Sequence, residues 1–386
     1  MLNHYDVIII GAGAAGLICS IEAGKRGRRV LVLDHANKPG KKILMSGGGR
    51  CNFTNYLVEP NKFISHNPHF CKSALARYTQ WDFIELVKKH QIPFHEKTLG
   101  QLFCDNKSKD ILEMLLKECE LAGVEIRLNT PVEKIKKTVS GFKLDKLECE
   151  SLVIATGGLS IPTLGASPFG YQIAEQFGIK VWPTRAGLVP LTLHEQDKEK
   201  FAVLSGIGVD TLVESEQKTF REASLFTHRG LSGPAILQIS SYWNPGETIK
   251  INFLPELNIE EFLQTAPAIK QLNTVLTKFL PARVIEVLLP ANLATRKINS
   301  LTKAEIVEMI AHLQAREIKP NGTEGYRTAE VTLGGVDCDA LSSKTMMAKE
   351  VEGLYFIGEV VDVSGWLGGY NFQWAWSSGW CAGQVV

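Results

Sequence analysis

The stretch that decides the fold stands near the start of the chain and runs Tyr5-Asp-Val-Ile-Ile-Ile-Gly11-Ala-Gly13-Ala-Ala-Gly16. Its apolar run is typical of a buried strand, and the segment Leu17–Ala23 that follows has the composition of a helix. A second β-rich run, Arg29–Leu33, ends in Asp34. This order of strand, G-x-G-x-x-G, helix, strand and acid predicts a dinucleotide-binding unit.

Each part of that fingerprint has a physical task. Gly11 permits a tight turn, Gly13 lets the backbone approach a pyrophosphate, and Gly16 lets the helix pack closely on the strand. The start of the helix offers unpaired N–H groups and the positive end of the helix dipole to an anion. Asp34 is placed to accept hydrogen bonds from ribose hydroxyls, which disfavours a 2′-phosphate there.

The rest of the sequence indicates which dinucleotide is bound. A separate nicotinamide domain would need a second fingerprint in the same context, and none is present. The nearest candidate, Gly165–Gly170, has the wrong spacing and a proline where a helix would begin. We therefore expect FAD as the tightly held cofactor, with NAD(P)H as a transient reductant.

Length and composition set broad limits. A chain of 386 residues, 45% of them hydrophobic, predicts two or three domains. No apolar run approaches the roughly 18 to 20 residues that span a bilayer, and Asp6 with no basic region before it argues against a secretion signal. Eight scattered cysteines without a C-x-x-C pair indicate free thiols and no metal site. We expect a soluble, cytoplasmic protein without a membrane partner.

Charge is unevenly distributed along the chain. Residues 1–100 hold 14 Lys and Arg against 7 Asp and Glu, a net charge of +7, which leaves −6 for the remainder of a chain whose total is +1. Such a basic third suits a polyanionic ligand, either a dinucleotide or a nucleic acid.

Two further glycine-rich stretches are candidates for cofactor contact. Ser46-Gly-Gly-Gly-Arg-Cys-Asn52 forms an anion nest with directed polar groups, suited to lying along a flavin or its phosphates. Thr156-Gly157-Gly158 follows the predicted strand Leu152–Ala155, so its backbone can also approach the cofactor.

The C-terminal stretch carries a third glycine-rich turn. A strand over Gly353–Gly358 ends in Glu359, and Asp362 follows. A helix that begins near Gly369 would direct its N–H groups and positive dipole end at the flavin edge where negative charge develops on reduction. Either Asp362 or Glu359 is expected to bind the ribityl chain.

The middle of the chain reads as an insertion that splits the nucleotide-binding domain. Residues 191–253 alternate β-like segments with turns, whereas 259–315 show helical periodicity. We expect residues 1–190 and 321–386 to form the nucleotide-binding domain, 191–256 a β-rich domain and 257–320 a helical domain. A single helix is also expected from Asn67-Pro68 to about His90, and Ser108 is expected to cap a helix that reaches Leu121.

Long compound motifs point to a known family. They are Ser46–Asn52, Phe226-Thr-His-Arg-Gly-Leu-Ser-Gly-Pro234, Val331-Thr-Leu-Gly-Gly335 and the Gly353–Gln373 stretch. Together these segments resemble the YhiN/BaiN-type family of bacterial FAD-dependent oxidoreductases, over nearly the whole chain. The Gly165–Gly170 segment and the tryptophan-rich tail are most similar to the YhiN branch.

The resemblance implies a fold and a set of contacts. The fold is α/β, with a Rossmann-like FAD-binding domain of the two-dinucleotide-binding flavoprotein type, interrupted by a β-barrel-like domain and a small helical domain. The FAD contacts that it implies are Gly11, Gly13, Ala14, Ala15, Gly16, Asp34, Lys42, Ser46, Gly47, Gly48, Gly49, Arg50, Cys51, Asn52, the Val132 backbone, Thr156, Gly157, Gly358, Glu359, Asp362, Gly369, Tyr370 and Asn371.

The resemblance also implies a choice of reactions. The family is similar to enzymes that reduce activated C=C bonds, to oxidases of small amino ketones and, in the YhiN branch, to an enzyme that reduces uridine to dihydrouridine in ribosomal RNA. We expect an NAD(P)H-driven reductase of a conjugated C=C, with ribosomal RNA or otherwise a small molecule as substrate. The alternatives are a flavin oxidase of small amines and a non-catalytic, FAD-stabilised RNA-binding factor.

Reduction of a polarised C=C needs a proton donor besides the hydride of the flavin. The first candidate is Cys51, with Arg50 as an electrostatic stabiliser, since a thiol beside a cation in a glycine nest can have an altered pKa. The further candidates are Tyr370, His228, His66 and His69.

Overall fold

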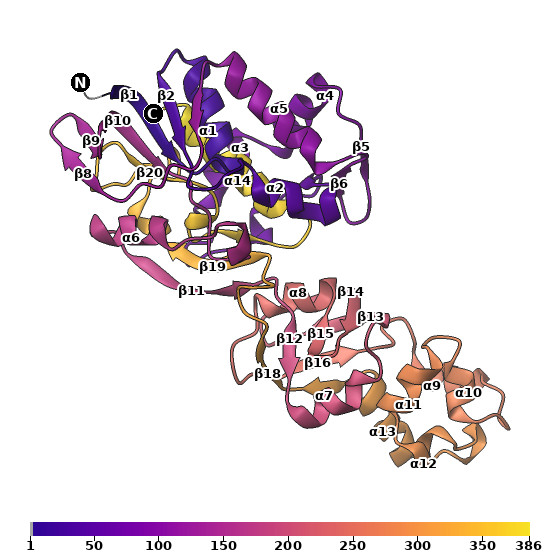
Figure 1. Ribbon diagram of the computed structural model, residues 1–386. Helices are drawn as coiled ribbons and strands as arrows, with labels where there is room; N and C mark the ends of the chain where they lie inside the picture. Colours follow the sequence, from indigo (N-terminus) through magenta and orange to yellow (C-terminus); the bar gives the residue numbers. More distant parts are fainter. Residues whose placement is uncertain (1–2) are drawn as a thin grey trace. The chain divides into compact units, whose positions relative to one another are not determined.

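The computed structural model describes residues 3–386, which form two compact units (Figure 1). Unit 1 holds the residues up to Arg185 together with Val331–Val386, and unit 2 holds Ala186–Glu330. Unit 2 contains both the β-rich and the helical part of the insertion, and their division into two domains stays a prediction. Every helix among the described residues is too short or too polar to cross a lipid bilayer.

A mostly parallel sheet forms the centre of unit 1, in the strand order β7-β2-β1-β10-β9-β8, and β20 also pairs with β10. The neighbours β7, β2, β1, β10 and β20 run parallel, whereas β8 and β9 extend the sheet antiparallel. The Rossmann-like fold predicted from the sequence is confirmed. The bounds are β1 (Asn3–Ile10), β2 (Val30–Leu33), β7 (Glu125–Arg127), β8 (Ile135–Thr138), β9 (Gly141–Leu144), β10 (Leu147–Ile154) and β20 (Leu354–Phe356).

Two helices from opposite ends of the chain pack against each other in unit 1. They are α1 (Ala14–Lys25) and α14 (Tyr370–Gly383). The guanidinium of Arg26, just after α1, donates to the carbonyls of Gly383 and Val386 at 3.0 and 2.9 Å. The C-terminal helix is therefore held on the first helix of the nucleotide-binding fingerprint.

The remaining elements of unit 1 surround this centre. They are α2 (Lys41–Met45), β3 (Asn52–Asn55), β4 (Phe63–Ile64), α3 (Cys71–Arg77), α4 (Gln80–Lys89), β5 (Phe94–Glu96), β6 (Gln101–Cys104), α5 (Ser108–Leu121), α6 (Phe169–Gln176), β11 (Val181–Gly187), β19 (Val331–Val336) and β21 (Ser364–Gly365). β3, β5 and β6 form one small antiparallel sheet, and β4 pairs with β21.

Two predictions about the helices need correction. The single helix expected up to about His90 is two helices, because Thr79 and Asp82 form a capping box that starts α4 anew. The helix α5 has its predicted range, but its N-cap is Lys107, and the Ser108 hydroxyl instead donates to the Leu44 carbonyl at 2.8 Å.

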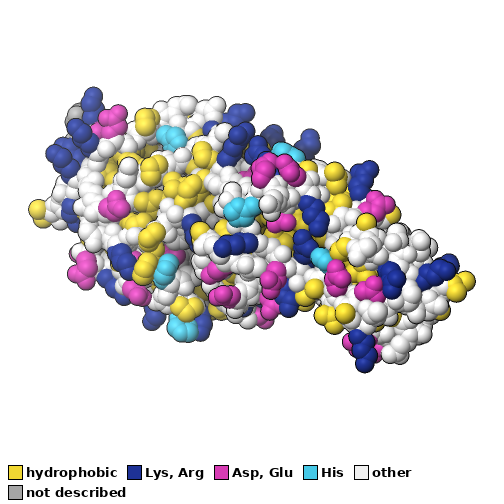
Figure 2. All heavy atoms as spheres, turned by 90° about the horizontal axis from the view of Figure 1, so that it is seen from below, with side chains coloured by type: hydrophobic (Ala, Val, Ile, Leu, Met, Phe, Trp, Pro, Cys, Tyr) yellow, Lys and Arg dark blue, Asp and Glu magenta, His cyan; other side chains and the backbone are white. Residues whose placement is uncertain are grey.

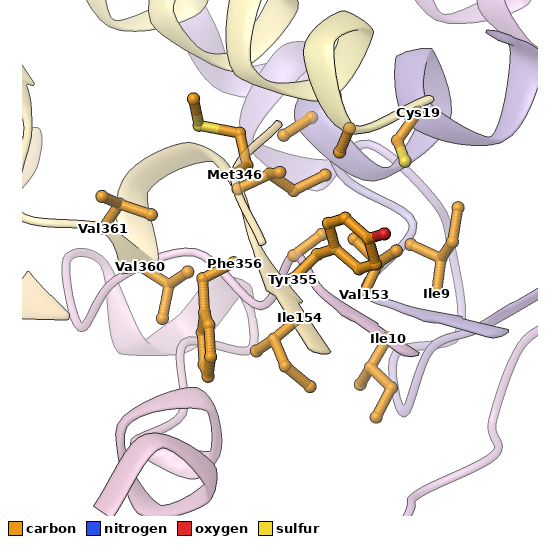
Figure 3. Close-up of a cluster of buried hydrophobic side chains, with 14 of the residues drawn as sticks. Ile9, Ile10, Cys19, Val153, Ile154, Met346, Tyr355, Phe356, Val360 and Val361 are labelled. Carbon is orange, nitrogen blue, oxygen red and sulfur yellow. The ribbon is translucent and has the colours of Figure 1, made fainter. Parts of the chain in front are cut away.

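The core of unit 1 lies where the sheet meets these helices. Figure 3 shows Ile9, Val153 and Tyr355, one from each of β1, β10 and β20, beside Cys19 of α1. Ile9, Val153 and Cys19 are fully buried, as the near-continuous apolar runs of parallel strands require. All eight cysteines are free, as the sequence predicts, and all are buried.

Unit 2 is built on one seven-stranded antiparallel sheet, in the order β17-β16-β13-β14-β15-β12-β18. Its strands are β12 (Leu191–Leu193), β13 (Gly208–Glu214), β14 (Thr219–Phe226), β15 (Gly230–Ser232), β16 (Ile249–Asn252), β17 (Arg316–Ile318) and β18 (Pro320–Thr323). Its helices are α7 (Glu195–Ala202), α8 (Pro234–Ser240), α9 (Ile259–Thr265), α10 (Leu272–Leu276), α11 (Ala282–Leu288), α12 (Ala291–Ala294) and α13 (Lys303–Leu313).

A buried carboxylate joins three helices of unit 1. Glu118 of α5 accepts hydrogen bonds from Lys89 and His90 at the end of α4, at 2.8 and 2.7 Å, and lies 3.7 Å from Lys25 of α1. Burial by itself would raise the pKa of Glu118, but the bonds and charges of these cations outweigh it and lower the pKa to about 2.

This lowered pKa makes the stability of unit 1 depend on pH. Since the folded pKa lies below the unfolded value of 4.5, the contribution of Glu118 is complete above about pH 4.5 and is lost as the pH falls towards 2. We expect Glu118→Gln to reduce the free energy of unfolding at neutral pH by about 2 kcal/mol and to flatten its pH dependence in that range. Urea unfolding at a series of pH values measures both.

The control is Glu113→Gln on the same helix, which removes an exposed pair with Lys109 and should leave the free energy of unfolding close to that of the wild type. Equal unfolding curves for the two variants would contradict the role given to Glu118.

Candidate functional site

Three chain turns meet at the carboxyl edge of the central sheet. The parallel register pairs Ile10 of β1 with Ile154 of β10, and Ile154 with Phe356 of β20. The strands therefore end level with one another and release Gly11, Ala155 and Ile357 at the same edge. Ligands of open parallel sheets bind outside this edge.

The first turn leaves open space in front of α1. A side chain at Gly11 would collide with the Ala155 carbonyl, so Gly11 is needed for close packing between the turns. Gly13 is different, because a Cβ built on it meets no atom within 4 Å and its φ of −90° suits any residue. Gly13 is the N-cap of α1, and no side chain caps the helix. An anion can therefore approach the N–H groups at the start of α1, where Ala14 and Ala15 lie.

Asp34, at the end of β2, stabilises the same turn through hydrogen bonds to its carboxylate. One carboxylate oxygen accepts from the Ala12 N–H and the other from the Ala36 N–H, each at 2.8 Å. The segment before Val132 is tied to this corner, since Thr130 N–H donates to the Asp34 carbonyl at 2.9 Å. Each carboxylate oxygen retains a further lone pair for a hydroxyl donor.

A charged network lies between the second and third turns. The Lys42 ammonium donates to Glu359 at 2.6 Å and to the Ser160 hydroxyl at 2.7 Å. The other Glu359 oxygen accepts from the Ser160 hydroxyl and from the Thr332 N–H, both at 3.0 Å. A Cβ on Gly157 would lie 3.8 Å from Glu359. The network brings Lys42 from α2 to Glu359, 317 positions later.

Two side chains of α14 hold the third turn, and neither is among the residues predicted from the sequence. The Gly358 N–H donates to the Ser378 hydroxyl, and the Trp374 indole donates to the Gly358 carbonyl, both at 3.0 Å. Gly358 has φ of +70°, and a Cβ there would lie 2.9 Å from that of Ala15. The signal available in the sequence was the four-residue spacing of Trp374 and Ser378, which places them on one helix face.

The loop Ser46–Asn52 contacts the start of α14. Gly47 and Gly48 have φ of +56° and +64°, and a Cβ at Gly48 or Gly49 meets no atom within 4 Å. In the amide orientation that satisfies its neighbours, Asn52 accepts from the Gly369 N–H at 3.2 Å. Asn371 then fixes the approach to the helix, since its amide bonds both backbone groups of Gly365, at 2.8 and 2.9 Å.

The structure separates the proton-donor candidates by their surroundings. Cys51 is fully buried in an apolar cluster with Leu17 and Ile18, and burial raises the pKa of its thiol to about 12. Arg50 beside it is exposed, and Tyr370 is buried against Phe63. His228 is exposed on the turn between β14 and β15 of unit 2.

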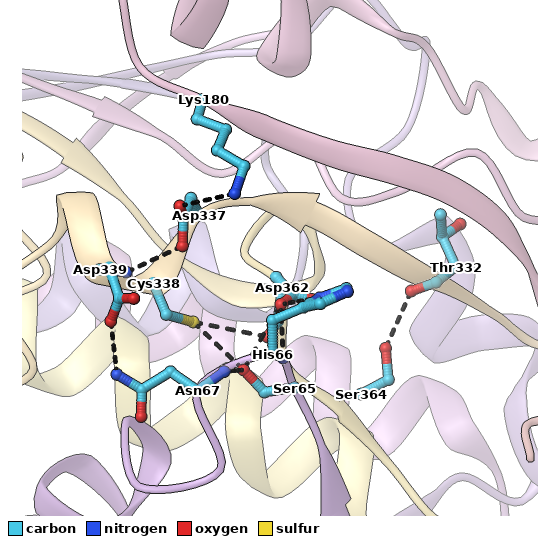
Figure 4. Close-up of polar contacts among 10 residues, drawn as sticks. All are labelled: Ser65, His66, Asn67, Lys180, Thr332, Asp337, Cys338, Asp339, Asp362 and Ser364. Atoms are coloured by element: carbon cyan, nitrogen blue, oxygen red, sulfur yellow. Dashed lines mark hydrogen bonds and ion pairs between the residues drawn. The ribbon is translucent and has the colours of Figure 1, made fainter.

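Asp362 and His66 form a pair close to the start of α14. The buried Asp362 carboxylate accepts from the His66 backbone N–H and from the His66 ring at Nδ1, both at 2.9 Å (Figure 4). Burial raises the pKa of Asp362, while these bonds from His66 oppose the rise. The His66 ring stacks on Trp182 with centroids 3.7 Å apart, and its side chain remains half exposed.

One expected contact turns away from the carboxyl edge. The Thr156 hydroxyl is buried without a hydrogen-bond partner among the described residues, and it lies where a Cβ on Gly170 of α6 would be. The Thr156 side chain therefore packs against α6, and the contact of Thr156 with a cofactor stays a prediction.

Comparisons with known proteins agree with this geometry. Residues 5–385 match the family described as HI0933-like protein Rossmann domain. The chain is 58% identical to the ribosomal RNA dihydrouridine synthase of Escherichia coli (strain K12), over 99% of this chain and 98% of that protein. It is 51% identical to the protein of the same name from Haemophilus influenzae, over the same shares of the two chains. It is 27% identical to the 3-dehydro-bile acid delta(4,6)-reductase of Clostridium scindens, over 98% of each chain.

The family match covers both segments of unit 1 and the whole insertion, and this coverage assigns the family. The chain belongs to the HI0933-like family and is an FAD-dependent oxidoreductase.

Proposed function

We propose that this enzyme reduces uridine to dihydrouridine in ribosomal RNA, with NAD(P)H as the reductant and the cytoplasm as its location. The observation that carries the RNA substrate is the 58% identity to an enzyme named for this reaction, spread over 99% of the chain. The net charge of +7 on residues 1–100 supports a polyanionic substrate beside the dinucleotide.

The carboxyl edge of unit 1 fits FAD. The open space at Gly13 lies at an uncapped helix start, which suits a pyrophosphate. In this proposal Asp34 would accept hydrogen bonds from the adenosine ribose, and the start of α14 at Gly369 would face the electron-accepting edge of the ring. The other residues that would line the cofactor are Ala14, Ala15, Lys42, Ser46 to Asn52, Val132, Gly157, Gly358 and Glu359.

Gly13→Ala tests this placement because the folded protein does not itself need a glycine there. We expect a free energy of unfolding within about 0.5 kcal/mol of the wild type in the absence of FAD, since the added methyl meets no protein atom. We also expect a loss of FAD affinity of about tenfold or more, because the methyl occupies the approach to the helix N-terminus. Urea unfolding and FAD titration measure the two effects.

Gly11→Ala is the contrasting control, since its methyl would collide with the Ala155 carbonyl and should destabilise the fold. Unchanged FAD affinity in Gly13→Ala would place the cofactor elsewhere.

Saturation of the uracil C=C requires one hydride and one proton, and bound FAD, once reduced by NAD(P)H, would supply the hydride. Of the candidate donors, His66 is the one that is both half exposed and oriented by a buried carboxylate. It follows β4, which pairs with β21 just before the start of α14. Imidazole is also the side chain that most readily exchanges a proton near neutral pH. His66 therefore donates the proton, and Asp362 positions its ring.

His66→Gln and His69→Gln form a matched pair to test the donor, since His69 is an exposed histidine three residues away. We expect His66→Gln to lower the rate of RNA reduction by about 10²-fold, because the glutamine amide cannot donate a proton to the substrate carbon. The rate of flavin reduction by NAD(P)H should remain at the wild-type value in both variants. Stopped-flow absorbance resolves the two half-reactions, and equal RNA reduction by both variants would exclude His66.

The function itself is tested by the RNA of the host. Deletion of the gene should remove a dihydrouridine from ribosomal RNA, and the purified protein with FAD and NAD(P)H should restore it to RNA from the deletion strain. Mass spectrometry of nuclease digests detects the gain of two hydrogens. An unchanged modification profile in the deletion strain would contradict the proposal.

A further inference from the structure

One segment of unit 2 carries a strong local excess of positive charge. Residues 266–304, here called the basic segment, contain six Lys and Arg and one acid, a net charge of +5. The rest of unit 2 contains 9 Lys and Arg against 16 Asp and Glu, a net charge of −7. The six cations are Lys270, Lys278, Arg283, Arg296, Lys297 and Lys303.

The fold gathers these cations and leaves most of them without a carboxylate. The basic segment contains α10, α11 and α12, and its two ends pair, since Leu272 N–H donates to the Arg296 carbonyl and Ile298 N–H to that of Lys270. Lys270 and Lys297 therefore lie on neighbouring segments. Arg296 binds Glu305 at 3.0 Å, but among residues 3–386 no carboxylate lies within 4.0 Å of the other five cations.

Cations without a carboxylate partner determine the local potential of a surface. On the face drawn in Figure 2, side chains of Lys and Arg and side chains of Asp and Glu both occur across the view. A surface with five exposed, unpaired cations in 39 residues keeps its positive potential and attracts a polyanion.

Two apolar side chains are exposed within the same segment. Ile269 is 76% exposed and Phe279 is 44% exposed. The Phe279 ring is held edge-on against Phe262 of α9, with centroids 5.2 Å apart at 90°. An aromatic ring fixed at the surface among cations offers a stacking platform for an unpaired base, as single-stranded RNA requires.

We propose that the basic segment is a docking surface for ribosomal RNA, with Lys270, Lys278 and Lys297 on phosphates and Phe279 against a base. The inference rests on the proposed function for the identity of the RNA. Phosphate contacts of this kind position the RNA without reading its sequence. The segment therefore supplies affinity, while the carboxyl edge of unit 1 carries the chemistry.

The test compares two double variants of the FAD-loaded enzyme that each remove two exposed lysines from unit 2. Lys270→Gln/Lys297→Gln removes charge from the basic segment, and Lys250→Gln/Lys319→Gln removes it from β16 and the turn between β17 and β18. Binding to a ribosomal RNA fragment is measured by fluorescence anisotropy over a range of salt concentrations.

We expect the basic-segment variant to bind about tenfold more weakly and its plot of log Kd against log salt to lose a slope of about 1 to 2, since each phosphate contact contributes about 0.7 to 0.9. The control should bind within about twofold of the wild type. Phe279→Ala should weaken binding with an unchanged salt slope, because stacking releases no counterions. Flavin content and unfolding curves of all variants should match the wild type.

The outcomes separate this inference from the proposed function. If the two double variants bind the RNA fragment with the same affinity and the same salt dependence, the proposed docking surface is wrong, whatever reaction the enzyme catalyses. If the basic-segment variant binds weakly but the wild type forms no dihydrouridine, the inference stands and the proposed function fails. If the wild type does not bind ribosomal RNA, both are overturned.

Discussion

The level ending of three parallel strands is the constraint on which the site depends. Because β1, β10 and β20 pair in register, the turns after them leave the sheet at one edge although the first and the third are more than 300 positions apart. Each turn contributes what the others lack: an uncapped helix start at Gly13, the backbone of Thr156 and Gly157, and the carboxylate of Glu359. A shift of register in any one strand would move its turn away from the edge.

The C-terminal helix holds the segments beside this shared edge in fixed positions. Trp374 and Ser378 form hydrogen bonds with both backbone groups of Gly358. Because α14 also packs on α1, the first and the last segments of the chain belong to the same packed unit. The loop Ser46–Asn52 is bound to the start of the same helix, because Asn52 accepts a hydrogen bond from the Gly369 N–H. One helix thus positions the glycine loop, the third turn and the first helix, which explains how so much of its surface is buried.

The sequence predicted the strands, the three glycine turns and the family because these depend on local patterns. The fingerprint needs glycine at fixed spacing for steric reasons, and the apolar runs of β1 and β10 reflect burial on both faces. The pairing of Asp362 with His66 and of Glu118 with Lys89 could not be predicted, since each joins residues whose approach is set by tertiary packing. The position of Cys51 illustrates the same limit: its neighbours in sequence are polar, but it is buried in an apolar cluster that also contains Leu17 and Ile18.

A crystal structure of the protein with FAD would show whether the three turns bind one cofactor. We expect electron density for one FAD molecule, with the pyrophosphate beside Gly13 and the ring system at the start of α14 near Gly369. Density that leaves the space at Gly13 empty, or that places the ring away from α14, would contradict the convergence of the three turns on a single cofactor.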